Sequence, residues 1–298
     1  MISPRSALRL LIPFLVACIS TGKAQATPLK IGVTLHPYYS WTANVVAGVP
    51  EVEVRGVIPA EVDAGDYQPT PKEIAQLADL DAIVINGLGH DDFILDMLRA
   101  SGNDKVVIIR PNDATPQIRG AHGEAANSHT FISFTNAIQQ TYAIARELGK
   151  LRPADEVTFE ANAAAYAKRL RAIKAEAATK LADPKISRVV TVHDGYSYLL
   201  QEFGIELAGV IEPAHGLIPS AKEMEEMVEL VRREKVRVVL SEASFPDKLL
   251  QVLRDEAGVK VYIISHIATG AYSPDEFEAQ MKTNADTLVE ALVTDPSR

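Results

Sequence analysis

From residue 29 onward, apolar and polar residues follow two patterns along the chain. Short apolar runs rich in β-branched residues end at turn residues, which is typical of buried strands. Between them, apolar residues recur every three or four positions, as on one face of a helix. The expected strands are residues 29–35, 51–58, 82–86 and 105–109 in the first half, and 188–193, 205–211, 236–241 and 259–264 in the second. The expected helices that alternate with them are residues 41–48, 70–80, 92–99, 196–203, 220–234, 246–257 and 274–293.

A long helical region separates the two halves of the chain. It extends from about residue 136 to residue 181 and is interrupted at residues 151–153, which include Pro153. From Phe159 to Leu181 the apolar residues form a single stripe. A helix of about 28 residues would span ~40 Å, enough to join two lobes stiffly.

Strands that alternate with helices pair in parallel, with right-handed crossovers. We therefore expect an α/β fold with two parallel-sheet lobes joined by one long helix. The expected divisions are an N-terminal lobe at residues 27–135, a helical linker region at 136–184 and a C-terminal lobe at 185–298.

The first 26 residues have the pattern of an export signal. Arg5 and Arg9 give a basic start, residues 10–19 are apolar, and Ala24-Gln25-Ala26 is typical of a cleavage site. We therefore expect a signal peptide at residues 1–26 and a mature protein in the periplasm. Residues 15–18, Leu-Val-Ala-Cys, also resemble a lipobox, so a lipid anchor at Cys18 is the alternative that we favour less.

Charge and cysteine content narrow the possible ligands. The net charge of −9 becomes −12 without the basic residues Arg5, Arg9 and Lys23 of the signal, which argues against binding to nucleic acid or an anionic membrane. Cys18 is the single cysteine and lies in the signal. A metal site in the mature chain would therefore use imidazole and oxygen ligands.

Histidines concentrate at the ends of the expected strands. Ligands of open α/β sheets bind beyond the carboxyl ends of the strands, and imidazole is the commonest protein ligand for zinc. Five of the seven histidines follow expected strands: His36, His90, His193, His215 and His266. This clustering favours a metal site between the two lobes.

The other two histidines and three carboxylates allow several interpretations. His129 directly precedes the helical region, and His122 lies in a stretch of small residues where we expect no structural role. Asp66, Asp194 and Glu242 could each be a ligand, an acceptor that orients a histidine, or a turn residue. The last two interpretations are favoured for each of them.

Six short motifs share their order with one known family. They are Asp66-Tyr-Gln-Pro-Thr-Pro71 with Ile74-Ala-Gln-Leu-Ala-Asp79, Asn86-Gly-Leu-Gly89, Asn127-Ser-His129, His193-Asp-Gly-Tyr-Ser-Tyr198, Pro219-Ser-Ala-Lys222 and Lys282-Thr-Asn284. In this order the chain resembles the metal-binding solute-binding proteins of bacterial ABC importers, the group that binds zinc or manganese. The resemblance covers essentially the whole mature chain and implies a site in the inter-lobe cleft with two ligands from each lobe.

The resemblance assigns two of the four metal ligands directly, and the other two ligand positions do not match the family. His129 and His193 match the family's ligands, but Gly65 stands where the family usually has a histidine, and His266 where it usually has an aspartate. His90 could supply the missing imidazole from a neighbouring loop. The expected metal ligands are therefore His90, His129, His193 and His266, with His36 in reserve.

Four imidazoles suit zinc better than manganese, which prefers oxygen ligands. We therefore expect a monomeric periplasmic protein that binds Zn2+ and delivers it to the membrane permease of an ABC transporter. If Glu242 or Asp66 completed the set, Mn2+ or Fe2+ would be favoured instead. The role of His215 stays open.

Two other functions remain as alternatives. A periplasmic zinc metallochaperone would use the same site. A zinc hydrolase, with Asp194 or Glu242 as general base, is the least favoured, because the chain has no His-Glu-x-x-His motif and four protein ligands would close the site to water. We therefore expect a transport protein and no enzyme.

Overall fold

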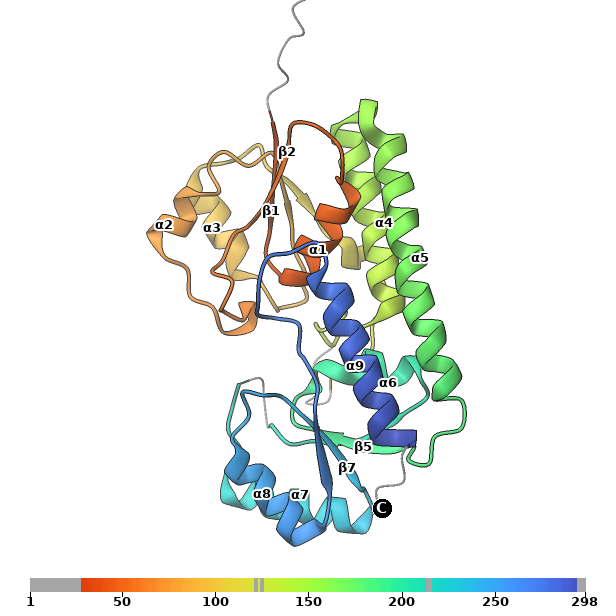
Figure 1. Ribbon diagram of the computed structural model, residues 1–298. Helices are drawn as coiled ribbons and strands as arrows, with labels where there is room; N and C mark the ends of the chain where they lie inside the picture. The colour runs from red at the N-terminus through yellow and green to blue at the C-terminus, as the bar shows by residue number, and fades with distance from the viewer. Residues whose placement is uncertain (1–27, 121–122, 124–125, 213–215, 294–298) are drawn as a thin grey trace, which may run out of the picture.

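Two four-stranded parallel sheets form the centres of two lobes (Figure 1). The computed structural model describes residues 28–293 except 121–122, 124–125 and 213–215, so the predicted signal peptide, with Cys18, lies outside the described residues. The first sheet has the order β2-β1-β3-β4, and its strands are β1 (Leu29–Val33), β2 (Val52–Gly56), β3 (Ala82–Val84) and β4 (Val107–Ile109). The second has the equivalent order β6-β5-β7-β8, and its strands are β5 (Arg188–Thr191), β6 (Glu206–Val210), β7 (Val238–Ser241) and β8 (Lys260–Ile263). The predicted α/β class with two parallel sheets is confirmed.

Helices flank both sheets close to the predicted positions. They are α1 (His36–Val45), α2 (Pro71–Ala75) and α3 (Phe93–Ser101) in the first lobe, and α6 (Ser197–Glu202), α7 (Ala221–Arg233) and α8 (Asp247–Ala257) in the second. Short 3-10 turns cover residues 64–66, 111–114, 153–155 and 194–196.

The two largest differences from the predicted helix boundaries have local reasons. The helix predicted at 41–48 begins at His36, because Pro37 has a fixed φ that suits the first turn of a helix. The helix predicted at 70–80 ends at Ala75, and the chain continues in turns in which Leu77 N donates to Ile74 O and Leu80 N donates to Leu77 O. The apolar spacing of three residues fits such tight turns as well as it fits an α-helix.

The region between the lobes is a helical hairpin. Helix α4 (Phe134–Leu151) ends where the interruption was predicted, and α5 (Glu156–Lys180) runs back beside it from the first lobe to the second (Figure 1). The 25 residues of α5 correspond to roughly 37 Å. None of the helices in the described part of the chain is long and apolar enough to cross a membrane.

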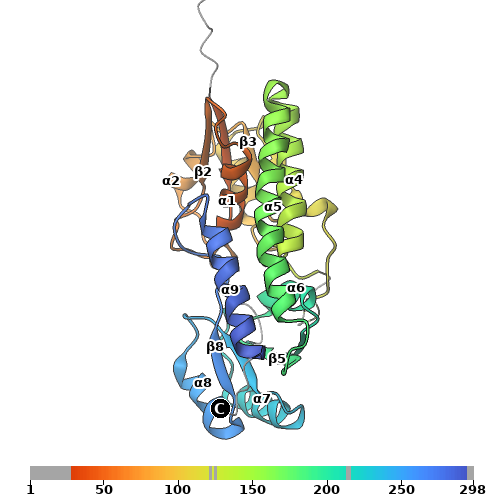
Figure 2. The ribbon, with the colours of Figure 1, turned by 45° about the vertical axis from the view of Figure 1, so that its right-hand side comes forward.

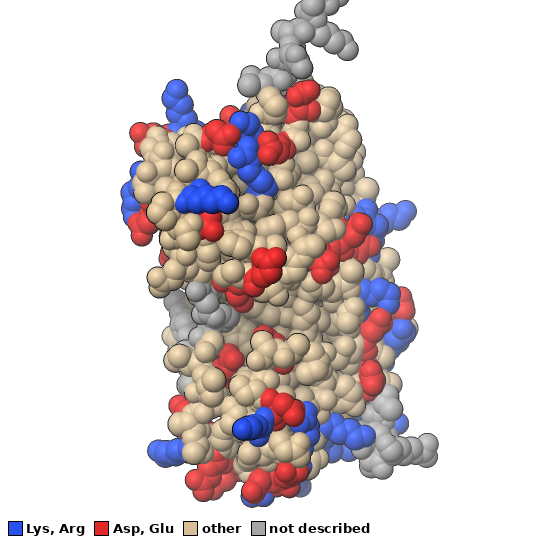
Figure 3. All heavy atoms as spheres, turned by 60° about the vertical axis from the view of Figure 1, so that its left-hand side comes forward, with Lys and Arg blue, Asp and Glu red and all other residues tan. Residues whose placement is uncertain are grey.

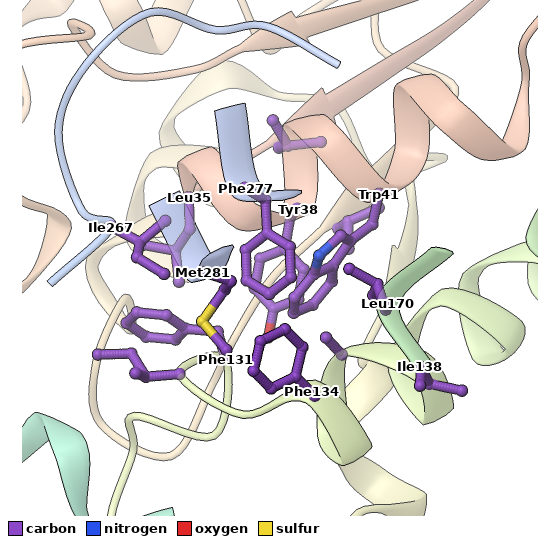
Figure 4. Packing of buried hydrophobic residues seen from close by; sticks show 14 of the residues in the cluster. Leu35, Tyr38, Trp41, Phe131, Phe134, Ile138, Leu170, Ile267, Phe277 and Met281 are labelled. Carbon is purple, nitrogen blue, oxygen red and sulfur yellow. The ribbon is translucent and has the colours of Figure 1, made fainter. Parts of the chain in front are cut away.

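The last helix also joins the lobes. After β8 the chain returns to the first lobe, and α9 (Glu276–Val293) then runs along α5 towards the second sheet (Figures 1 and 2). Phe277 packs edge-on against Trp41 of α1, with 5.0 Å between the ring centres, in the core seen in Figure 4. At the other end of α9, Leu292 O accepts a hydrogen bond from Ile186 N. Because α9 packs against both lobes, we expect metal binding to produce only small lobe rotations.

Candidate metal site

Three histidines from separate parts of the chain converge between the two lobes. His193 follows β5, His266 follows β8, and His129 precedes α4. Each offers one ring nitrogen, and these three atoms lie within 4.8 Å of one another. All three side chains are buried. The group therefore has the residue type, the spacing and the burial that could hold a metal ion.

The two histidines that match the family pattern are the closest pair. His129 Nε2 lies 2.9 Å from His193 Nε2, and the two rings meet edge to face. The ring of His266 lies 5.1 Å from that of His129 and 4.8 Å from that of His193. Ring nitrogens that face a common point in this way can be bridged by one cation.

The second ring nitrogen of each candidate histidine has an oxygen neighbour. Such contacts orient the ring and leave the other nitrogen for a metal. The contacts are His129 Nδ1 with Asn127 Oδ1 at 2.9 Å, His193 Nδ1 with Glu212 Oε2 at 3.2 Å, His266 Nδ1 with Asp63 Oδ2 at 3.1 Å, and His90 Nδ1 with Ser128 Oγ at 3.4 Å.

His90 lies beside the group of three. Its buried ring is 5.2 Å from that of His129, and its Nε2 is 4.0 Å from Asp63 Oδ1. The loop that carries it has positive φ angles at residues 87–89, including 56° at Leu88, which is strained for a residue other than glycine. The Asp91 carboxylate stabilises this loop by accepting hydrogen bonds from Asn86 N and Gly87 N at 2.7 and 2.6 Å.

Carboxylates make the surroundings of the histidines negative. Burial lowers the pKa of His266, but the hydrogen bond to Asp63 and the charges of Glu242 and Asp63 outweigh it, so this pKa is raised. For Asp63 the opposite holds: burial raises its pKa, but the contacts with His266 and His90 bring it well below the usual range. Asp63 is therefore ionised at neutral pH.

A cavity of about 560 Å³ adjoins His193 and His266. It is lined by the carboxylates Glu61, Asp63, Glu212 and Glu242. Acidic side chains border the hollow between the lobes in Figure 3. A concave surface of one charge sign concentrates counter-ions, so this cavity favours the approach of cations.

The other candidates from the sequence lie elsewhere or serve other contacts. His36 Nε2 contacts Gly270 O at 3.0 Å, its ring stacks on Tyr272, and burial lowers its pKa. Glu242 accepts a hydrogen bond from Tyr196 at 2.8 Å, and Asp194 accepts one from Ser197 at 2.7 Å. His122, His215 and the side chain of Asp66 lie outside the described part of the structure.

Sequence analysis missed the groups that orient the histidines. Glu212 follows β6, so its place at a strand end could have identified it. Asn127 belongs to the Asn127-Ser-His129 motif, from which only His129 is predicted to take part in the site. Asp63 had no comparable signal, because its partner His266 lies at the opposite end of the chain.

Gly195 provides space between two histidines, which leads to a first prediction. A Cβ at this position would lie 2.8 Å from His193 Cδ2 and 3.0 Å from His266 Cδ2. We expect Gly195→Ala to displace both rings and weaken Zn2+ binding by about tenfold, as measured by competition with a chelator. Gly209→Ala is the matched control, because its Cβ would meet the flexible side chains of Leu230 at 3.4 Å and Met227 at 3.6 Å, which are ordinary contacts. Equal affinity of the two variants would contradict the prediction.

Comparison with known proteins assigns the chain to one family. The sequence profile described as "ZnuA: Zinc-uptake complex component A periplasmic" matches residues 31–291. The chain therefore belongs to this family, which confirms the predicted resemblance.

Solved structures extend the match. The solute-binding protein FpvC from Pseudomonas aeruginosa in complex with Mn2+ is 41% identical, with a TM-score of 0.84 over 89% of this chain and 98% of FpvC. FpvC was also solved with a Ni2+ ion. A ZnuA crystal structure, 23% identical with a TM-score of 0.76 over 89% of this chain and 99% of that one, shows the same fold.

Among curated relatives, the zinc-binding lipoprotein AdcA from Streptococcus pneumoniae is 28% identical over 265 residues. The match covers 85% of this chain and 52% of AdcA, so the chain spans about half the length of this relative.

Proposed function

We propose that the protein binds a divalent metal ion, Zn2+ foremost, in the periplasm and delivers it to the membrane permease of an ABC transporter. The observation that carries this proposal is the buried group of His129, His193 and His266, whose ligand atoms lie within 4.8 Å of one another. Membership of a periplasmic zinc-uptake family supports the compartment and the role in transport.

The proposed ligands are the three grouped histidines and His90. The ring of His90 already lies beside that of His129, so a small movement of its loop would bring a fourth imidazole to the ion. The left-handed residues 87–89 give this loop an unusual backbone, which a bound ion could stabilise. Four protein ligands in a tetrahedron leave no position for a reactive water, which supports a carrier that is no enzyme.

Zinc is the preferred ion because of the chemistry of these ligands. Imidazoles suit Zn2+, Ni2+ and Cu2+, whereas Mn2+ prefers carboxylates. The FpvC structures contain Mn2+ and Ni2+, so we expect Ni2+ to compete with Zn2+ here. Glu242 lines the adjoining cavity, and its movement to the ion would be needed for tight Mn2+ or Fe2+ binding.

Metal content tests both the function and the fourth ligand. We expect about one Zn2+ per chain by elemental mass spectrometry of protein purified from periplasm without chelator. In the variant His90→Ala, Zn2+ affinity should fall by at least about tenfold, because one ligand is removed. His36→Ala is the matched control, since this buried histidine of the same lobe contacts Gly270 and Tyr272 and should leave affinity unchanged.

The outcomes of this experiment separate the alternatives. If His90→Ala retains full affinity and His36→Ala does not, the fourth ligand is His36. If both retain it, the fourth ligand is an acid or is absent. Wild-type protein that holds no metal, even after Zn2+ is added, contradicts the proposed function.

A further inference from the structure

One carboxylate of the first lobe contacts two candidate ligands. Asp63 lies in the loop after β2, and its Oδ1 accepts a hydrogen bond from Gly65 N at 2.9 Å. Its Oδ2 lies 3.1 Å from Nδ1 of His266, which follows β8 in the second lobe. Its Oδ1 lies 4.0 Å from Nε2 of His90, which belongs to the first lobe. Asp63 is therefore within hydrogen-bond distance of one candidate ligand of the second lobe and lies close to one of the first lobe.

The partners of the other two histidines each belong to the same lobe as the histidine that they contact. Glu212, the partner of His193, follows β6 of the same sheet. Asn127, the partner of His129, is two residues away in the chain. Asp63 and His266, by contrast, are 203 residues apart, and their contact connects the two lobes at the site.

The backbones on both sides of this contact are fastened to each other. Gly270 N donates a hydrogen bond to Ala60 O at 3.0 Å, and the Tyr272 hydroxyl donates one to Ile58 O at 3.1 Å. Gly56 leaves room for the Tyr272 ring, because a Cβ there would lie 2.1 Å from it. The segments that carry Asp63 and His266 therefore lie side by side and are joined by hydrogen bonds.

The site also needs negative charge nearby. Four neutral imidazoles around Zn2+ would leave a double positive charge in a buried site, which is costly without compensation. Asp63 and Glu212 each place a carboxylate against the Nδ1 of a candidate ligand. A carboxylate in this position orients the imidazole, makes it a stronger ligand and offsets the charge of the ion.

We propose that Asp63 is a positioning residue of the metal site, which holds the His266 ring across the lobes with Nε2 towards the ion and keeps His90 beside the group. This proposal rests on the proposed metal-binding function. It concerns a residue that does not itself bind the ion. His90 and His266 are the two ligand positions at which this chain departs from the family pattern. Asp63 lies beside both, so a single carboxylate would position both of these imidazoles.

Two substitutions separate positioning from local structure. Serine and asparagine can both accept the hydrogen bond from Gly65 N as Asp63 does. Asparagine can also accept from His266 Nδ1, whereas serine is too short. We expect Asp63→Ser to weaken Zn2+ binding by about 10- to 100-fold, and Asp63→Asn to lose less than about tenfold. The melting temperature of the metal-free protein should be the same in both variants.

Cobalt provides a direct view of the coordination. The Co2+ absorption bands of Asp63→Asn should have the wild-type positions, since the same imidazoles bind the ion. Glu61→Gln is the control for charge, because Glu61 lines the same cavity as Asp63. We expect it to weaken Zn2+ binding by less than about threefold, because it removes one charge from the cavity and keeps the contact of Asp63 with His266.

Each contrary result is distinct. Unchanged Zn2+ affinity in Asp63→Ser, or an equal loss in Glu61→Gln, overturns the positioning role. Shifted Co2+ bands in Asp63→Asn would make Asp63 a direct ligand and overturn it as well. If the wild-type protein binds neither Zn2+ nor Co2+, the proposed function fails together with this inference.

Discussion

Replacement of His193 with alanine is expected to raise the Zn2+ dissociation constant by more than about 100-fold, beyond the loss typical of groups that only support a ligand. His193 is at the centre of the group: its Nε2 lies 2.9 Å from that of His129, and its ring is 4.8 Å from that of His266. Without the His193 imidazole, the ring nitrogens of His129 and His266 would hold the ion with one ligand fewer. Competition with a chelator of known affinity measures the change.

The same variant needs a control for folding. His193 is buried and contacts Glu212, so its loss could also alter the metal-free protein. The melting temperature of both metal-free proteins should therefore be compared, and His36→Ala again serves as a buried histidine outside the group. Wild-type Zn2+ affinity in His193→Ala would exclude the proposed site.

Acid is expected to release the metal over a narrow pH range. An imidazole must lose its proton to bind Zn2+, and each proton displaced changes the apparent affinity by about tenfold per pH unit below the pKa. With four imidazoles as ligands, the dissociation constant should rise steeply as the pH falls.

The raised pKa of His266 shifts the start of this release. Because the Asp63 carboxylate favours the protonated ring, the pKa of His266 is raised, and the ring keeps its proton to a higher pH than an ordinary histidine does. Protons therefore compete with the ion at a higher pH than at an ordinary histidine. Dissociation constants measured from about pH 8 to about pH 5, with the protons released on binding, check this. An affinity that does not change over this range would mean that imidazoles do not bind the ion.

The strands were predictable because burial imposes a local pattern. A buried parallel strand is largely apolar and ends at turn residues. All eight strands lie within their predicted ranges, including the half-exposed β2, which carries Glu53 and Arg55. The stripe on α5 and the break before it follow from equally local causes, namely helical periodicity and Pro153. Helix ends were less predictable, as α2 shows, because apolar spacing alone does not distinguish a helix from successive tight turns.

The candidate site could be predicted only in part from such local patterns. His193 and His266 follow strands that deliver them to the same place, and they do lie together. His36 follows a strand as well, but its ring stacks on Tyr272. Position after a strand brings a side chain near the cleft, whereas its direction depends on what packs against it from elsewhere in the chain.

By itself, the sequence determined the α/β class, the two sheets and the histidines at their edges, since these depend on residue type and on spacing between near neighbours. Only the tertiary structure decided which histidines share a point in space and which groups orient them. The contact of Asp63 with His266 joins distant parts of the chain, and the left-handed backbone at residues 87–89 sets the direction of the loop to His90. The contact of Asp63 with His266 depends on packing between remote segments, which no local pattern encodes, whereas Gly87, Gly89 and the Asp91 carboxylate set the loop backbone locally.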